Sequence, residues 1–269
     1  MPAGSAQSQA SLIQAVDEAL ETGADATVVG DELFALVGIL DAQPALRRVL
    51  TEPSVPSEAK AQLVGSLLAD KVSEATEKIV DAAVGMRWSH GGDLADGLER
   101  AGAACQIIKA EQDGDLDSLE DELFRFSRIL VGARGLRDTL GNRRAPIEAK
   151  RKLVDNLLDG KVTTSTMALV RQAVSGRGGP LPIVLRRFQE LAAARRERLV
   201  ALVRVAAALT EDQAERLAEA LGDQYGKRVH LNVIVEPDVL GGVRVQIGDE
   251  VIDSTVATRL AEARRRLAG

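Results

Sequence analysis

Asp249, Glu250 and Asp253 form the closest grouping of side chains in this sequence that could bind a metal ion or act as a general acid and base. Asp249 falls where a tight hairpin turn favours aspartate, and Asp253 falls where a following helix favours an acid at its start. No histidine or cysteine accompanies the three acids at ligand spacing. We therefore interpret them as turn and cap residues and expect neither a catalytic nor a metal site here.

The other reactive side chains are few and lie far apart in the sequence. His90 falls in a predicted loop, His230 falls in a predicted strand, and Cys105 is the only cysteine. A zinc site or a Cys–His pair needs several such residues close together. A single cysteine also excludes a disulfide framework and is typical of a small buried apolar side chain. These observations favour a protein that is not an enzyme.

Gly241 and Gly242 are the best candidates for a phosphate-binding loop. Such a loop leads directly into a helix N-terminus, usually with Lys and then Ser or Thr. Here the two glycines lead into Val243–Ile247, whose alternating apolar residues are typical of a strand. We expect a turn with positive φ before a hairpin, and no bound cofactor.

A basic run is the remaining candidate for a binding site, with five cations in ten residues: Arg143, Arg144, Lys150, Arg151 and Lys152. It is either a solvated helix face or a patch for an acidic partner. The net charge of −6 argues against general nucleic-acid binding. Residues 1–100 carry −9, residues 101–190 carry +3, and residues 191–269 carry zero.

The elements that position these residues are repeated at a spacing of 90 residues. Asp31-Glu-Leu-Phe34 recurs as Asp121-Glu-Leu-Phe124, and residues 31–84 match residues 121–174 at 23 of 54 positions. Chance similarity would not hold one register over several helical turns and their loops, so a segment of about 90 residues was duplicated.

Each copy has the apolar spacing of about five or six short helices, with one buried stripe per helix. One such stripe is predicted at positions 33, 34, 36, 39 and 40, and its counterpart at 123, 124, 126, 129 and 130. Pro56 and Pro146 fit the first turn of a helix, where no amide partner is lost. A long helix from about Asp93 to Ala110 is predicted to join the copies. Leu, Val, Ile and Ala dominate the apolar residues, since aromatic residues are only 2% of the chain, and this suits helix-on-helix packing.

After residue 194 the pattern changes to a small α/β domain. Thr210 and Gln213 have the spacing of a capping box, which would start a helix that ends near Tyr225. Three strands follow, at 229–235, 243–247 and 250–252, and Ser254 is predicted to cap a last helix. The expected fold is mainly α: helical bundles at 1–100 and 101–194, then a small α/β domain at 195–269. No apolar run is long enough to span a membrane and no secretory signal is found, so we expect a soluble chain.

The segment Val239–Asp253 closely resembles the C-terminal signature of the ATP synthase delta subunit, equivalent to the oligomycin-sensitivity-conferring protein. The motif positions, which we interpret as structural, are Gly241, Gly242, Gly248, Asp249, Ile252 and Asp253. Ser254-Thr255 stands where the family usually has Gly-Ser. The resemblance covers residues 101–269, so the first copy is an addition, as in actinobacterial members of the family.

The resemblance implies a stator component of the peripheral stalk in a proton-translocating ATP synthase, without an active site or cofactor. It also implies one copy per complex, at the cytoplasmic face of the cell membrane. The expected partners are amphipathic N-terminal helices of the alpha subunits and a b-type stalk subunit, with no nucleic acid. In the family the alpha helix binds between the first and fifth helices of the bundle, which selects Ile107, Ile108, Leu169, Val170 and Ala173. Each of the five could instead be a core residue.

Three further points stay open at the level of the sequence. The charge difference leads to the hypothesis that the second copy binds the alpha subunit and the first copy faces another partner or solvent. The chain could also be a helical adaptor that bridges two unrelated proteins. It is either a free-standing subunit or part of a longer stalk fusion.

Overall fold

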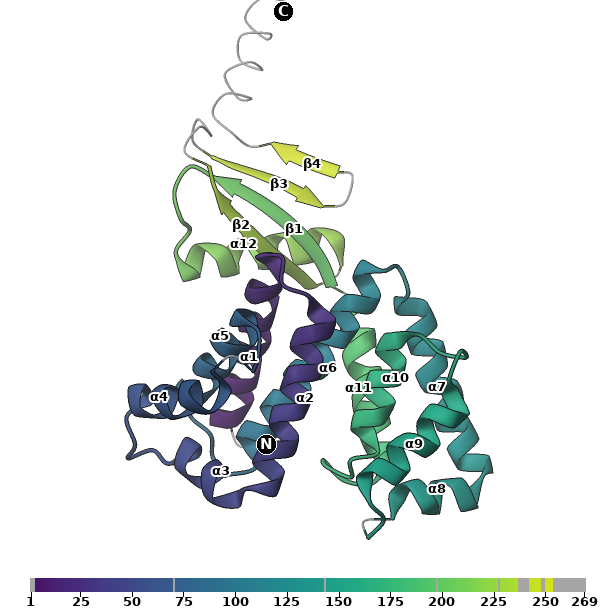
Figure 1. Ribbon diagram of the computed structural model, residues 1–269. Helices are drawn as coiled ribbons and strands as arrows, with labels where there is room; N and C mark the ends of the chain where they lie inside the picture. The colour runs from purple at the N-terminus through teal and green to yellow at the C-terminus, as the bar shows by residue number, and fades with distance from the viewer. Residues whose placement is uncertain are drawn as a thin grey trace, which may run out of the picture. The chain divides into compact units, whose positions relative to one another are not determined.

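The computed structural model describes residues 3–69, 71–142, 144–196, 198–226, 228–236, 242–247 and 250–253. The chain forms two compact units, Met1–Ala193 and Ala194–Gly269. The first is made of helices, and the second contains a sheet with a helix (Figure 1). This arrangement confirms the predicted mainly α fold with a small α/β part at its end.

The helices of the first unit follow the duplication. Shifting α2–α5 by 90 residues gives α7–α10 to within two residues at either end. The bounds in the first part are α1 Ala3–Glu21, α2 Ala26–Ala42, α3 Pro44–Thr51, α4 Ser57–Leu68 and α5 Glu74–Gly85. The later helices are α6 Asp93–Gln112, α7 Leu116–Gly132, α8 Arg134–Gly141, α9 Ile147–Leu158, α10 Thr164–Ala173 and α11 Leu181–Arg196.

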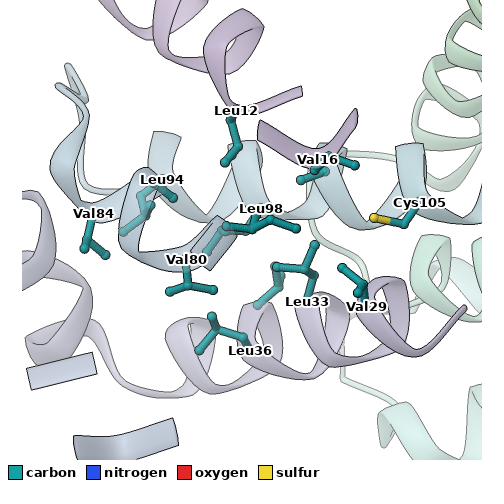
Figure 2. Close-up of a cluster of buried hydrophobic side chains, with 14 of the residues drawn as sticks. Leu12, Val16, Val29, Leu33, Leu36, Val80, Val84, Leu94, Leu98 and Cys105 are labelled. Atoms are coloured by element: carbon teal, nitrogen blue, oxygen red, sulfur yellow. The ribbon is translucent and has the colours of Figure 1, made fainter. Parts of the chain in front are cut away.

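Helix α6 belongs to both copies at once. Leu94, Leu98 and Cys105 pack into the first hydrophobic cluster, with side chains of α1, α2 and α5 (Figure 2). Ala103 and Ile107 pack into the second cluster, with side chains of α7–α11. The long joining helix is therefore confirmed. The boundary proposed between residues 100 and 101 falls inside it, and the division into three domains stays a prediction.

The helix starts use the signals that the sequence carries, with one difference. Ser73 and Thr163 are N-cap residues whose side chains accept hydrogen bonds from Thr76 and Thr166. Pro56 and Pro146 were expected in the first turn but occupy the N-cap position, one residue earlier. The Pro56 carbonyl there accepts the first intrahelical bond, from the amide of Lys60. The missing proline N–H costs nothing at either position.

The apolar stripes are only partly buried. Leu33, Leu40, Leu123 and Leu130 are in the core, as predicted. The prediction is wrong for three other positions of these stripes, because Ile39, Phe124 and Ile129 are 44%, 57% and 51% exposed. Adjacent apolar positions on a helix point about 100° apart, so a stripe two residues wide buries one edge more than the other.

The second unit has the predicted α/β pattern. Its elements are β1 Arg198–Val205, α12 Glu211–Tyr225, β2 Arg228–Val235, β3 Val243–Ile247 and β4 Glu250–Asp253. The strand order is β2-β1-β3-β4; β1 and β2 are parallel and the other pairs antiparallel. The capping box of Thr210 and Gln213 is present, and Gly226 ends α12 at a φ of 65°. The helix predicted after Ser254 lies outside the described residues.

Candidate protein-interaction site

The five side chains predicted to bind a partner helix are all buried. Ile107, Leu169, Val170 and Ala173 are at most 1% exposed and belong to the second hydrophobic cluster. Ile108 is 5% exposed and belongs to the first cluster. The structure therefore brings four of the five together, but in the core rather than on a surface.

Helix α2 of the first copy packs closely along α6 at this place. Gly30 of α2 crosses Gly102 of α6 so closely that a Cβ on Gly102 would lie 3.1 Å from the Gly30 carbonyl oxygen. Phe34, one turn after Gly30, is 8% exposed and belongs to the second cluster. Small residues allow two helix backbones to approach, and the aromatic ring then fills the space beside them. The first copy thus contributes a side chain to the core of the second.

Polar contacts also stabilise this junction between α2 and α6. The Gln106 side-chain amide of α6 donates to the Asp31 carboxylate at 3.0 Å. Arg177, in the loop after α10, donates to Asp96 at 2.7 Å and to the Gly92 carbonyl at 3.0 Å, and it also pairs with Asp41 of α2. Charge-assisted bonds of this kind are stronger than neutral ones, so α2, α6 and the loop after α10 are held as one assembly.

Glu99 is a buried carboxyl within this assembly. Its Oε1 accepts a hydrogen bond of 2.7 Å from the Gln172 side chain on α10. Burial raises the pKa of Glu99, while the Gln172 bond and the Arg177 charge oppose the rise. Because burial makes ionisation of the Glu99 carboxyl unfavourable, we expect the stability of this junction to depend on pH.

A polar cleft of about 740 Å³ lies where α2 meets α9 and α10. Asp31, Phe34, Thr163 and Arg171 are among its lining residues. Burial raises the pKa of Asp31, and the nearby Arg171 counteracts this rise. Arg171 is itself bonded to Asp155 at 2.6 Å. The cleft is therefore bounded by groups that already have partners within the fold.

A second cleft, of about 660 Å³, lies in the first copy between α1 and α5. Ala15 of α1, Val28 of α2 and Lys78 of α5 line it, and Val28 is 44% exposed. These helices are the repeat counterparts of α6 and α10. The duplication therefore predicts an equivalent groove in each copy, between α1 and α5 and between α6 and α10. Whether a groove is open or covered depends on where α2 packs.

Among the residues that the structure describes, those considered for chemistry lie in separate elements. Glu250 and Asp253 lie in β4, where Ile252 packs on the sheet core. Gly242 has a φ of 88°, which confirms the predicted turn conformation at that residue. Gly241, Gly248 and Asp249 lie outside the described residues. Within the described part of the chain, no group of three or more His, Cys, Asp or Glu side chains could hold a metal ion.

Cys105, His90 and His230 are the remaining candidates for nucleophilic chemistry. Burial raises the pKa of Cys105 to about 12, so its thiol is protonated and unreactive at neutral pH. His90 lies 3.5 Å from Asp93, whose carboxylate also accepts a 2.6 Å bond from Ser5. His230 lies in β2, as expected. None of these contacts forms a nucleophile–base pair.

The basic run is not simply a solvated face. Lys150 is 4% exposed and donates to the Val174 carbonyl at 3.1 Å, and burial lowers its pKa. Its counterpart Lys60 is 6% exposed. Arg151 pairs with Glu148 at 3.3 Å. Arg143 lies outside the described residues. The interpretation as a solvated face is therefore wrong for Lys150, which holds a carbonyl near the end of α10.

In the ranges that the structure covers, no helix has the length and apolar character needed to cross a membrane.

Comparison with known proteins gives a consistent result. Residues 101–267 match the family model described as ATP synthase delta (OSCP) subunit. The chain is 47% identical to the ATP synthase subunit delta of Beutenbergia cavernae, over 98% of this chain and 99% of that protein. It is 45% identical to the same-named protein of Kineococcus radiotolerans, over 92% and 90% of the two chains. The Thermobifida fusca protein of that name is 44% identical, over 96% of both.

Those relatives extend over both copies of the repeat, so the duplication is shared with them. The family is a structural and not a catalytic part of the ATP synthase, which agrees with the scattered chemistry of the described residues. The chain belongs to the ATP synthase delta (OSCP) subunit family, whose members are components of the peripheral stalk.

Proposed function

We propose that this chain is the stator link of a proton-translocating ATP synthase: it holds N-terminal helices of the alpha subunits through its helical unit and a b-type stalk subunit through its α/β unit. The observation that carries the proposal is the likeness to delta subunits over 98% of the chain. One copy per complex, at the cytoplasmic face of the membrane, belongs to the same proposal.

The position of the alpha contact has two candidates. The first is the face of α6 and α10 that includes Ile107 and Val170. Since these side chains are buried, a partner helix would reach them only by displacing the helices that cover them. The second is the open cleft between α1 and α5 of the first copy. The second candidate needs no rearrangement, and we favour it for that reason over the second-copy contact that the charge difference suggested.

The packing of α2 against α6 supports a helix as the occupant of the cleft between α1 and α5. On the second copy, α2 lies against α6 with a small residue, Gly30, at the crossing and Phe34 one turn further. In the first copy, α1 carries two small residues one turn apart, the exposed Ser11 and the half-buried Ala15, and Ala15 lines the cleft. An amphipathic helix with small and apolar residues on one face can pack there by the same geometry.

The test is the binding of a synthetic alpha N-terminal peptide to the full chain. The full chain is required because α6 contributes side chains to both hydrophobic clusters, so a cut after residue 100 would damage both. Ala15→Arg places a charge inside the cleft of the first copy. We expect it to weaken peptide binding at least tenfold.

Gln7→Arg is the matched control, since Gln7 is exposed on the same helix and does not line the cleft. Unchanged binding in Ala15→Arg would argue against the first-copy cleft and return the contact to α6 and α10. Loss of peptide binding by the unmodified chain would argue against the alpha contact as a whole.

The stalk contact is assigned to the second unit. Val233, Ile234 and Val235 on β2 are 38%, 41% and 48% exposed, and β2 is an outer strand of the described sheet. Exposed apolar side chains on an outer strand favour a protein partner. Ile234→Asp is expected to reduce co-purification with the b-type subunit, whereas equal recovery would contradict this placement.

The adaptor interpretation, which the sequence left open, has no observation in its favour, because the chain belongs to the delta subunit family. Purification of the tagged chain from detergent-solubilised membranes separates the two. Co-purification of alpha and beta subunits is expected for the stator link, and their absence with an intact fold would favour an adaptor.

A further inference from the structure

The cleft between α1 and α5 combines a floor of small side chains with an acidic rim. The alanines that line it are buried or half-buried: Ala15, Ala19, Ala24, Ala75 and Ala82. The charged lining residues within the described part of the chain are exposed, and three are acids and one is a base: Glu18, Asp25, Glu74 and Lys78. A helix that enters the cleft therefore meets alanines below it and mainly carboxylates beside it.

The base on this rim is already neutralised by one of the acids. The Lys78 amine lies 2.7 Å from the Glu74 carboxylate, and this bond lowers the pKa of Glu74. Glu18 accepts a hydrogen bond of 3.1 Å from the neutral side chain of Gln14, and Asp25 accepts one of 2.8 Å from the backbone amide of Thr27. Neither bond cancels a charge, so the rim stays negative within a copy that carries −9 over residues 1–100.

The second copy shows what covers the counterpart of this cleft. There α2 lies against α6 and α10, and Thr27, Asp31 and Phe34 of α2 line the polar cleft together with Ala168 of α10. At spacings of four and three residues, the three side chains share one face of α2. Ala168 is the counterpart of Lys78. A helix is therefore the occupant that this surface of the repeat accepts.

The charge that faces the covering helix is reversed between the copies. Burial raises the pKa of Asp31 on α2, and the nearby Arg171 of α10 counteracts this rise. The counterpart of Arg171 is Asp81, which is exposed on α5 beside Ala82 of the cleft. The helix that covers the second copy thus presents an acid to a base. A helix that covers the first copy in the same way meets an acid at that position.

We propose that the cleft between α1 and α5 selects a basic amphipathic helix. Large apolar side chains of this helix lie on the alanine floor, and its Lys or Arg side chains lie opposite Glu18 and Asp81. The selectivity rests on the proposed function in one respect, namely that this cleft holds a partner helix. Carboxylates on the rim attract a basic helix and repel an acidic one, so they distinguish partners of similar apolar character.

The experiment measures the binding of two designed peptides to the full chain by titration calorimetry. Both are helices of about 18 residues, or five turns, with the same face of Leu and Ala. They differ only beside that face, where one carries Lys and the other Glu. At low salt, the Lys peptide is expected to bind at least tenfold more tightly. The difference should shrink at high salt, because salt screens exposed charges.

Charge-reversal variants locate the selectivity in the cleft. Asp81→Arg brings the charge of the second copy into the first, and Glu18→Lys changes the α1 side of the rim. Each should weaken binding of the Lys peptide at least tenfold and strengthen binding of the Glu peptide. Glu58→Lys is the matched control: Glu58 is exposed on α4, does not line the cleft, and gives the same change of net charge. It should change either affinity less than twofold.

Three results would overturn the proposal: no binding of the Lys peptide, equal binding of both peptides at low salt, or the same effect of Glu58→Lys as of Asp81→Arg. The alpha N-terminal peptide separates this outcome from that of the proposed function. If the alpha peptide does not bind but the Lys peptide shows the preference, the alpha contact fails and the selectivity stands. If binding of the alpha peptide depends on Ala15 but not on the charges of Glu18 and Asp81, the selectivity fails and the alpha contact stands.

Discussion

The carboxylate of Glu122 accepts hydrogen bonds from both the backbone amide of Thr163, at 2.9 Å, and its hydroxyl, at 3.0 Å. Thr163 is the N-cap residue of α10, so Glu122 on α7 fixes the start of a helix 41 residues away in sequence. The first copy repeats this contact, since Glu32 accepts from the amide and hydroxyl of Ser73 at 3.0 and 2.8 Å. We call this contact, a glutamate carboxylate bonded to the amide and hydroxyl of an N-cap residue, the clamp. Both copies have it, and they differ only in the N-cap residue, Ser73 or Thr163.

Removal of this clamp is expected to destabilise either copy to a similar extent. Glu122→Ala and Glu32→Ala each leave a part-buried N-cap amide without its charged acceptor, and a hydrogen bond to a charged group typically contributes about 1.5–3 kcal/mol. Urea unfolding of the full chain measures the change. Glu148→Ala is the control, because Glu148 is an exposed first-turn acid that pairs with Arg151 on the same helix. An equal effect of all three variants would contradict a special role for the clamp.

The close crossing of α2 and α6 predicts opposite effects for two glycines. A Cβ on Gly102 would lie 2.8 Å from Phe34, so Gly102→Ala should force the helices apart and cost about 1–3 kcal/mol. A Cβ on Gly38 meets nothing within 4 Å, so Gly38→Ala should stabilise α2 by up to about 1 kcal/mol. In thermal unfolding, Gly102→Ala should lower Tm and Gly38→Ala should raise it. The same sign for both would exclude this account of the crossing.

Glu99 predicts a pH dependence with a definite sign. Its folded pKa lies above the ordinary value of 4.5 because of burial, so the folded chain binds this proton more tightly than the unfolded chain. The contribution of Glu99 to stability therefore decreases as pH rises from 4.5 through the folded pKa. Glu99→Gln removes the ionisation and keeps an acceptor for Gln172. The stability of the variant relative to the unmodified chain should increase from pH 4.5 to pH 7.5, and a pH-independent difference would contradict the assignment.

Arg177 is expected to fix the two copies to one another. Its side chain is 10% exposed and contacts Asp41, Asp96 and the Gly92 carbonyl. Because both acids are partly exposed, Arg177→Ala should cost about 1–3 kcal/mol rather than the full value of a buried pair. Hydrogen exchange should increase first along α2 and around the loop after α10. Arg128→Ala, a change on an exposed face, should stay within about 0.5 kcal/mol.

Much of the fold could be predicted because its signals are local. The capping box of Thr210 and Gln213, the turn conformation of Gly242 and the strands around it depend on neighbouring residues and were confirmed. The second copy of the helical segment was visible because duplication preserves the apolar spacing.

The candidate site was harder to predict because burial is not a local property. Ile107 and Val170 have the same sequence character whether they face a partner helix or another helix of the same chain. Nor does the sequence around Lys150 distinguish an exposed cation from one that donates to the Val174 carbonyl. Only the position of helices far apart in the sequence distinguishes these cases.

Local patterns in the sequence are sufficient to predict the repeat, the helices, the α/β part and the family resemblance. The packing of helices far apart in the sequence determines that α6 serves both copies and that α2 crosses it at Gly30 and Gly102. The physical reason is that periodicity fixes which face of a helix is apolar, whereas the helix that covers this face depends on close packing among distant segments.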